Sequence, residues 1–389
     1  MSPIPPPVPS DPIREEVDRF ADAHRLGERY RAYDRSPAFP VEEFQRLGEA
    51  RLLGLSVPAS FGGRGLSALR SARGLFQLAY RGGTMAAKLS LQPEFSSVLA
   101  RAGSPDLRAG YLDPLFRGRM LVGNQVTEPH AGSDAAALRA RAVYRTGAYR
   151  ISGTKTQVAF AEDAQAAIVY ARTERPGGRS GISAFLIPQD LAGIRRERVP
   201  DYGERWMGRG TVVYDDVELP EAYRLGEEGQ GFELLRQELT HERALLGAIY
   251  LGVAWASFEE TVAFVAQREA FGRPLAAQQA ISFPLVEDEA RLTAAWGLLE
   301  RVLTRLDAGE PVDGEAAMSK WYCGHVALEA VDHAMQFHGG QGYAEELPHA
   351  QRYRDLRSAR VAHGTDEVMH LVATRKRWPR PPRSSPGNG

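Results

Sequence analysis

The stretch "FELLRQELTHERALLGAIYLGVAWASFEETVAFVAQREAFG" (residues 232–272) decides the fold. Its apolar residues recur every three or four positions over many turns, which predicts one long amphipathic helix. Two later stretches, 280–309 and 313–340, repeat this pattern, and a fourth helix is expected to begin near Thr365. Four long helices joined by short links predict a four-helix bundle over residues 231–378.

Two regions of different texture precede this bundle. Residues 12–120 carry apolar residues at helical spacing and predict an N-terminal α-helical domain. Residues 121–230 contain short β-rich runs separated by Gly, Pro and Asp, which predict a small antiparallel barrel or sandwich. Within them, "AVYRTGAYRIS" (142–152) predicts a hairpin with a Thr-Gly turn. The expected fold class is therefore α+β with three domains.

The chain ends and the composition narrow the functional classes. Residues 1–11 and 379–389 are rich in proline and are expected to form a flexible arm and a disordered tail. The net charge of -1 gives no bulk positive field, and no apolar run approaches the roughly 18 residues that span a bilayer. We therefore expect neither nucleic acid nor a membrane as partner. The single cysteine, Cys323, cannot form an internal disulfide, which fits a cytoplasmic protein.

The segment "RVAHGTDEVMH" (360–370) places two histidines and two carboxylates within eight residues. On a helix, His363 and His370 would lie two turns apart on one face. At this point the segment is a metal site, a catalytic site or a charged helix start.

Three further segments each have a plain interpretation and a functional one. "QVTEPHAGSDAA" (125–136) is a polar connector, or a strip of donors for a ring edge or phosphate. "QREAFGRPLAAQQAISF" (267–283) is a helix–helix turn, or supplies an arginine for phosphate and a phenylalanine for stacking. "MQFHGGQGYAEE" (335–346) has three glycines after a helix, where a C-cap needs only one.

These segments, together with "ISGTK", "YDDVELP" and "YRDLRSARVAHGTDEVMHLVATR", resemble the acyl-CoA dehydrogenase family in that family's order, over residues 39–375. The resemblance implies a helical domain, a middle antiparallel β-barrel and a C-terminal four-helix bundle. It also implies FAD as cofactor and an acyl thioester as substrate, carried on CoA or on an acyl carrier protein. A carboxylate would remove the α-proton while the β-hydrogen leaves as hydride to flavin N5.

The resemblance implies cofactor-binding roles for the residues that match the family's motifs. Residues expected to meet the flavin and its diphosphate from one subunit are Gln125, Val126, Thr127, Gly132, Ser133, Gln157, Ala159, Thr365 and Glu367. Residues expected to reach the cofactor from a neighbouring subunit are Arg268, Phe271, Leu275, Gln278, Gln336, Phe337 and Gly340. A homodimer or homotetramer is therefore implied, with an electron-transfer flavoprotein as the electron acceptor.

The catalytic base departs from the family's usual pattern. His363 stands where most members have the catalytic glutamate, whereas Glu242-Arg243 matches the earlier position used by isovaleryl-type and long-chain-type members. Glu242 is the candidate base and His363 its rival. The alternative is a solvated helix glutamate paired with Arg243 or His241. Residues expected to meet the substrate are Ser133, Thr240, Arg243, His363 and Gly364.

Other departures lie near the flavin and the pantetheine arm. Gln157 replaces a tryptophan, Ala159 replaces a threonine whose hydroxyl reaches N5, and Thr240 replaces an aspartate. Gln157 and Ala159 keep open a flavin-dependent monooxygenase of the same fold. Loss of the common base, were Glu242 not present, would fit a non-catalytic flavoprotein scaffold. Under the resemblance, residues 360–370 become a cofactor-binding turn and helix start, and no metal site is expected.

Overall fold

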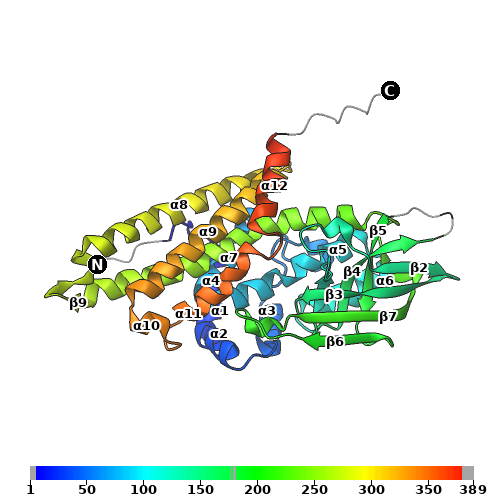
Figure 1. Ribbon diagram of the computed structural model, residues 1–389, viewed down its shortest axis with the longest axis horizontal. Coiled ribbons are helices and arrows are strands. Elements are labelled where there is room, and N and C mark those ends of the chain that lie inside the picture. The colour runs from blue at the N-terminus through cyan, green and yellow to red at the C-terminus, as the bar shows by residue number, and fades with distance from the viewer. Residues whose placement is uncertain (1–5, 176, 178–180, 379–389) are drawn as a thin grey trace.

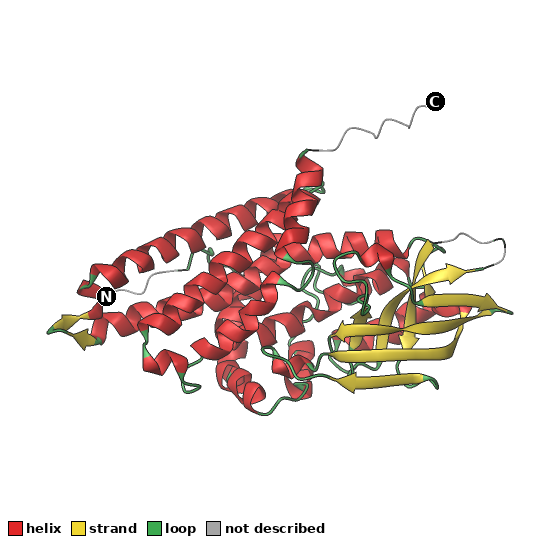
Figure 2. Cartoon of the chain, viewed as in Figure 1, coloured by secondary structure: helices red, strands yellow, loops and turns green. Residues whose placement is uncertain are grey.

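The computed structural model describes residues 6–175, 177 and 181–378. The expected tail at 379–389 and the first five residues of the expected arm lie outside the described residues. The larger sheet lies at one end of the molecule, a short two-stranded hairpin lies at the other, and helices form most of the rest (Figure 2). The chain passes from helices to strands and back to long helices (Figure 1), which is the predicted α+β order.

The N-terminal domain is helical, as predicted. Its elements are α1 (Pro12–His24), α2 (Leu26–Arg35), α3 (Val41–Glu49), η1 (Ala59–Phe61), α4 (Ala68–Leu91), η2 (Gln92–Ser96), α5 (Ser97–Ala102) and α6 (Pro105–Phe116). Helix α1 begins at Asp11, whose side chain accepts a hydrogen bond from the Ile13 amide at 3.1 Å. The described part of the expected flexible arm is instead packed, because Val8 is 2% exposed and its carbonyl accepts a bond from Arg14.

The middle domain is a β-sheet. Its elements are β1 (Val122–Gln125), η3 (Ala135–Ala137), β2 (Arg141–Arg145), β3 (Ala148–Val158), β4 (Ala166–Glu174), β5 (Gly181–Pro188), β6 (Ile194–Arg198), η4 (Arg205–Met207), β7 (Gly210–Pro220), η5 (Glu221–Tyr223) and β8 (Arg224–Leu225). The predicted hairpin is confirmed, since β2 and β3 pair antiparallel. They meet at Thr146 and Gly147, which have φ of 48° and 85°.

The sheet differs from the expected antiparallel barrel in two ways. Its strand order is β6-β7-β3-β2-β4-β5-β8, and β1 and β2 both pair parallel with β4. Strand β4 pairs with β2 in parallel because the link over residues 159–165 carries the chain from β3 past β2 to its other edge. The outer strands β6 and β8 do not pair with each other among the described strands, so the sheet stays open.

The C-terminal domain contains three of the four predicted long helices, and the fourth, α12 (Asp366–Arg377), is shorter than expected, with 12 residues. Its elements are α7 (Gly231–Gln267), β9 (Glu269–Ala270), β10 (Arg273–Pro274), η6 (Leu275–Ala277), α8 (Gln279–Asp307), α9 (Asp313–Phe337), α10 (Gly340–Tyr343), α11 (His349–Leu356), η7 (Arg357–Arg360) and α12 (Asp366–Arg377). The expected start of the fourth helix is confirmed, because the Thr365 side chain caps α12 by accepting from the Val368 amide at 3.3 Å.

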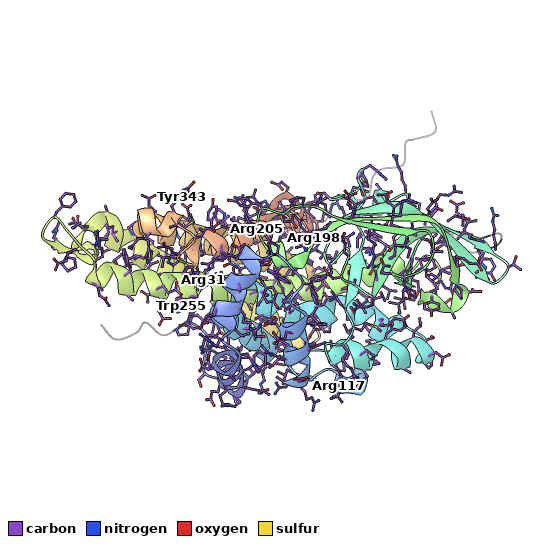
Figure 3. The ribbon with its side chains drawn as sticks, turned by 90° about the horizontal axis from the view of Figure 1, so that it is seen from below. Arg31, Arg117, Arg198, Arg205, Trp255 and Tyr343 are labelled. Carbon is purple, nitrogen blue, oxygen red and sulfur yellow. The ribbon has the colours of Figure 1, made fainter. Side chains whose placement is uncertain are left out.

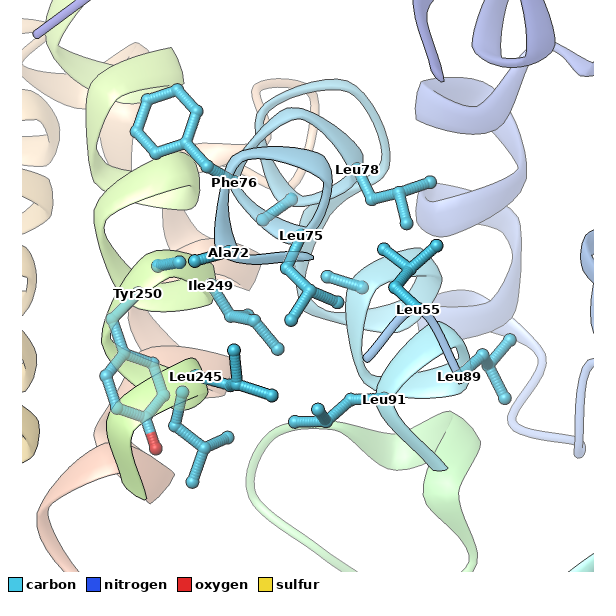
Figure 4. Packing of buried hydrophobic residues seen from close by; sticks show 14 of the residues in the cluster. Leu55, Ala72, Leu75, Phe76, Leu78, Leu89, Leu91, Leu245, Ile249 and Tyr250 are labelled. Carbon is cyan, nitrogen blue, oxygen red and sulfur yellow. The ribbon is translucent and has the colours of Figure 1, made fainter. Parts of the chain in front are cut away.

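Helix α7 is enclosed on both sides. Every residue from 242 to 258 is buried, because α4 of the N-terminal domain packs along the face opposite α9. Leu75 and Phe76 of α4 lie beside Leu245 and Ile249 of α7 in this core (Figure 4). By length and composition α7 could cross a membrane, but 72% of its most apolar window is buried within the protein. The enclosure makes α7 a rigid platform for the polar residues near its start.

Candidate active site around Glu242 and His363

Helix α7 and the turn before α12 bring the two rival base positions together. Glu242 is 2% exposed, and its Oε2 lies 3.3 Å from Nδ1 of His363. His363 and Gly364 have φ of 54° and 102°, so the chain makes a tight left-handed turn there. The solvated-glutamate alternative is wrong, since Glu242 is buried and Arg243 and His241 bond to other groups.

Two cations hold this turn by consecutive carbonyl oxygens. Arg243 Nε donates to the His363 carbonyl at 3.0 Å, and Lys320 Nζ donates to the Gly364 carbonyl at 2.7 Å. Lys320 is fully buried, and burial lowers its pKa to about 8. A Cβ added at Gly364 would lie 2.5 Å from Cε of Met369. The position of the turn is therefore determined by α7, α9 and the glycine together.

A second carboxyl group, absent from the predicted site, lies one helical turn before Glu242. Glu238 is 1% exposed and accepts hydrogen bonds from Asn124 Nδ2 at 2.9 Å and from the Tyr170 hydroxyl at 3.1 Å. Burial, the charge of Glu242 and a hydrogen bond to Glu242 raise the pKa of Glu238 well above its ordinary value. Glu238 lies four residues before Glu242 in a polar stretch of α7, so nothing in the sequence indicates that it is buried.

His241 points to the N-terminal domain. Its Nε2 lies 2.8 Å from Oγ of Ser56, and that hydroxyl also donates to Glu94 at 2.7 Å. The Ser56 amide donates to the same carboxylate at 2.8 Å. This group could not be predicted from the sequence, because Ser56 of a loop and Glu94 of η2 are brought to α7 only by the fold.

A buried ion pair anchors the polar loop after β1. Lys155 Nζ lies 2.8 Å from Glu128 and 3.0 Å from the Val126 carbonyl, and both charged side chains are buried. Although burial raises it, bonds from Lys155 and from the Arg139 amide hold the pKa of Glu128 below its usual value. Glu128 and Lys155 lie within the motifs "QVTEPHAGSDAA" and "ISGTK", but the sequence alone predicts no role for either.

The predicted cofactor-binding residues on this loop differ in whether their side chains are buried or exposed. Gln125 is 1% exposed, and its side chain bonds to Tyr214 and Gln189 inside the sheet, so only its backbone is available to a cofactor. Val126 and Thr127 are half-buried, while Gly132 and Ser133 are exposed. A Cβ added at Gly132 would meet no atom within 4 Å, so the loop borders open space.

The end of β3 carries the two departures near the flavin. Gln157 is exposed with φ of 57°, at a register shift between Lys155 and Val158. Ala159 follows and is half-buried. The irregular strand end therefore leaves an amide side chain outside and a methyl group where the resemblance implied a hydroxyl.

The residues expected to reach a neighbouring subunit's cofactor lie elsewhere. Helix α7 rises about 1.5 Å per residue, so the segment from Glu242 to Arg268 spans about 39 Å. Arg268, Gln336 and Gly340 are exposed, and Phe271 is 98% exposed at the tip beside β9 (Figure 1). Leu275, Gln278 and Phe337 are half-buried nearby. Tyr343 of α10, 84% exposed, projects from the same end of the molecule (Figure 3). One protomer does not bring the two groups together.

The predicted substrate position Thr240 has a carboxylate beside it. Its hydroxyl donates to Oδ1 of Asp313 at 3.0 Å, and Asp313 also binds Arg236 at 2.6 Å and Lys376 at 3.1 Å. The aspartate that the resemblance implied at 240 is thus replaced by a carboxylate from the start of α9.

The arrangement fits an extended cofactor with an anionic middle. Exposed backbone and hydroxyl groups of the 125–136 loop, and the capped start of α12 with Thr365 half-buried and Glu367 exposed, are surfaces suited to a ring edge and a diphosphate. Two cavities of about 740 and 730 Å³ lie apart from this cluster, and Glu242 lines neither. The candidate site is therefore located by its side chains and not by either cavity.

Comparison with known proteins agrees with this arrangement. Three family models match in order: the acyl-CoA dehydrogenase N-terminal domain over residues 10–119, the middle domain over 123–217 and the C-terminal domain over 229–376. An acyl-CoA dehydrogenase of Bacillus subtilis is 30% identical over 88% of this chain and 91% of that protein. The L-prolyl-(peptidyl-carrier protein) dehydrogenase of Pseudomonas fluorescens is 32% identical over 88% of this chain and 92% of that protein.

The fold has the same close relationship to solved structures. The structure of PigA with FAD and proline superposes with a TM-score of 0.88 and 26% identity, covering 94% of this chain and 96% of that one. Family models across nearly the whole chain and a relative that carries FAD establish both fold and cofactor. The chain is an FAD-dependent oxidoreductase of the acyl-CoA dehydrogenase family.

Proposed function

We propose that the protein introduces an α,β double bond into an acyl thioester, with Glu242 as the base that takes the α-proton. The observation that carries this proposal is the state of Glu242 itself. Its Oε1 is buried and has no hydrogen-bond donor among the described residues, while its Oε2 faces His363. A buried carboxylate beside the clamped turn has the position that a general base needs in a site closed to water. When bound, FAD accepts the hydride that leaves the β-carbon.

The geometry gives His363 a supporting role. Its Nδ1 faces Glu242 Oε2 at 3.3 Å, so the imidazole orients the carboxylate. The side chain of His363 is 26% exposed, whereas that of Glu242 is 2% exposed. A base that works in a water-excluded site is better served by the buried group.

The clamped turn supplies the second requirement of the reaction. An α-proton becomes acidic enough for a carboxylate only if the thioester oxygen is polarised. The backbone N–H of residue 363 has this role in our proposal, and Arg243 and Lys320 support it by fixing the two carbonyls that follow it in the chain. A fixed donor stabilises developing negative charge without reorganisation during the reaction.

The substrate in this proposal is a thioester on a phosphopantetheine arm, of CoA or of a carrier protein. The 32% identity to a prolyl-(peptidyl-carrier protein) dehydrogenase supports the carrier form. Thr240 and Asp313 provide a hydroxyl and a carboxylate close to Arg243 on α7, where an amide-containing arm finds both donor and acceptor.

We also propose a homo-oligomer in which each FAD is completed by a second subunit. The support is the distance of about 39 Å between Glu242 and Arg268 on one helix. The exposure of Phe271 adds to it. An electron-transfer flavoprotein is the proposed acceptor. Dilution that dissociates the oligomer is expected to release FAD, as followed by flavin fluorescence, whereas a monomer that retains FAD contradicts the shared site.

One experiment tests the proposed reaction. Purified yellow protein is mixed anaerobically with a panel of acyl-CoA and acyl-carrier-protein thioesters, prolyl thioesters included, and the flavin absorbance is followed. Bleaching by a thioester, with formation of an α,β-unsaturated product, is expected.

The exposed Gln157 and the missing hydroxyl at Ala159 favour the monooxygenase as second candidate. Product formation that requires oxygen and a reductase, without bleaching by any thioester, supports it and rejects the dehydrogenase.

A further inference from the structure

Glu238 and Glu242 form a buried carboxyl pair on one face of α7. They lie four residues apart, and the side chains of both are almost fully buried. Both oxygens of Glu238 already accept a bond, one from Asn124 of β1 and one from Tyr170 of β4. These two donors hold Glu238 in place from the middle domain.

One buried oxygen of the pair lacks a hydrogen-bond donor unless one of the two carboxyl groups is protonated. Glu242 Oε1 is buried without a donor among the described residues, and two ionised carboxylates cannot bond to each other. A hydrogen bond between the two groups is among the causes that raise the pKa of Glu238. One proton between Glu238 and Glu242 removes this deficit and avoids two adjacent buried charges.

We propose that Glu238 is a positioning residue that keeps its proton and donates a hydrogen bond to Oε1 of Glu242. The pair then holds one proton and one negative charge, and the charge stays on Glu242, which His363 faces on its other oxygen. This rests on the proposed function, in which Glu242 is the base. Glu238 thereby keeps the base ionised and aimed, and does not itself touch the substrate.

The groups around the pair assign the proton to Glu238. Among the described residues, Glu238 receives hydrogen bonds from the neutral donors Asn124 and Tyr170, and the charge of Arg101 on α5 lowers its pKa less than burial raises it. Glu242 has the cation Arg243 next to it and His363 facing it. The positive side chain and the imidazole favour the charge on Glu242, so the proton remains on its partner.

The first test needs no substrate. Infrared difference spectra at pH 7 compare the FAD-loaded wild type with Glu238→Gln, which keeps the shape but cannot be an acid. We expect the carbonyl stretch of a protonated carboxylic acid in the wild type and its loss in the variant. Glu233→Gln, at an exposed position on the same helix, is the matched control and is expected to keep the band. The same spectrum for wild type and Glu238→Gln overturns the proposal.

The second test uses the pH dependence of flavin reduction by a thioester that bleaches the wild type. Glu238→Leu removes the hydrogen-bond donor to Oε1 of the base, so the acidic limb of the rate profile is expected to move to higher pH. Glu238→Gln retains a donor and is expected to leave the limb in place. An ionised Glu238 would repel the base, so a limb that moves down, or not at all, in Glu238→Leu overturns the proposal.

The two tests distinguish failure of the proposed function from failure of the proposed role of Glu238. If no thioester bleaches the wild type, the proposed function fails, while the infrared band still decides whether Glu238 is protonated. If the wild type is bleached but the band is absent, the reaction stands and only the role of Glu238 fails.

Discussion

Lys320 is the residue whose burial is hardest to explain without a role for the turn it holds. A fully buried lysine is costly, and within the described part of the chain Lys320 donates to the Gly364 carbonyl at 2.7 Å. A hydrogen bond from a charged donor contributes about 1.5–3 kcal/mol. Lys320→Met is therefore expected to slow flavin reduction by about 10- to 100-fold at retained FAD content, measured by stopped flow. An unchanged rate contradicts a role for the clamped turn.

Some of the individual residues of the candidate site could be predicted from the sequence. Glu242 and His363 were both named through the family resemblance, and the structure places them 3.3 Å apart. Glu238 and Lys320 were not named, because their partners Asn124 and Gly364 lie on other elements. A single sequence without tertiary contacts does not distinguish a buried glutamate of this kind from a solvated one.

Among the elements, α7 depends on close approach to α4. A Cβ added at Gly252 would lie 2.3 Å from the Phe76 carbonyl oxygen, so Gly252→Ala must push the helices apart. It is expected to lower the free energy of unfolding by about 1–3 kcal/mol. Gly297 of α8 has open space, and Gly297→Ala is expected to raise it by up to about 1 kcal/mol. Chemical denaturation checks both values, and equal effects of the two variants would show that packing at Gly252 is unimportant.

The loop after β1 depends on one buried ion pair. Lys155→Met leaves the Glu128 carboxylate buried without its cation, which costs about 3–5 kcal/mol. We expect a lower free energy of unfolding and faster loss of FAD on dialysis. Lys376→Met removes a half-exposed lysine and is expected to change stability by less than about 1 kcal/mol. Retention of both stability and FAD in Lys155→Met is the contrary result.

Helices and strands were predictable to different degrees. The long helices and the hairpin at Thr146-Gly147 follow from periodicity and turn chemistry, which are local. The parallel pairing of β1 and β2 with β4 depends on which edge the chain crosses to, and no local pattern carries that information. The same holds for the packing of α4 against α7, which buries residues 242–258 of α7 on both sides.

For the whole molecule, Asp355 of α11 joins the three domains. Its carboxylate accepts bonds from the hydroxyls of Tyr30 and Thr84 in the N-terminal domain and from the Glu204 amide in the middle domain. Burial, with the nearby charge of Glu204, raises the pKa of Asp355 to about 7. Domain arrangement is therefore coupled to one titration near neutral pH.

This coupling predicts a pH dependence of stability. Between the ordinary pKa of 3.8 and about 7, the native protein binds more protons at Asp355 than the unfolded chain does. The contribution of Asp355 is fully present below that window and is lost as pH rises through about 7. Asp355→Asn is expected to flatten this part of the stability profile between pH 5 and 8, measured by thermal unfolding. Identical profiles for both proteins contradict the coupling.

The most direct test of the central claim compares Glu242→Gln with His363→Ala in anaerobic single-turnover flavin reduction, each at confirmed FAD content. Removing a general base costs about 10²- to 10⁴-fold in rate. We predict that loss for Glu242→Gln, and a smaller one, within about tenfold, for His363→Ala, whose imidazole orients the base. Normal reduction in Glu242→Gln together with loss of reduction in His363→Ala would assign the proton to the histidine and contradict the claim.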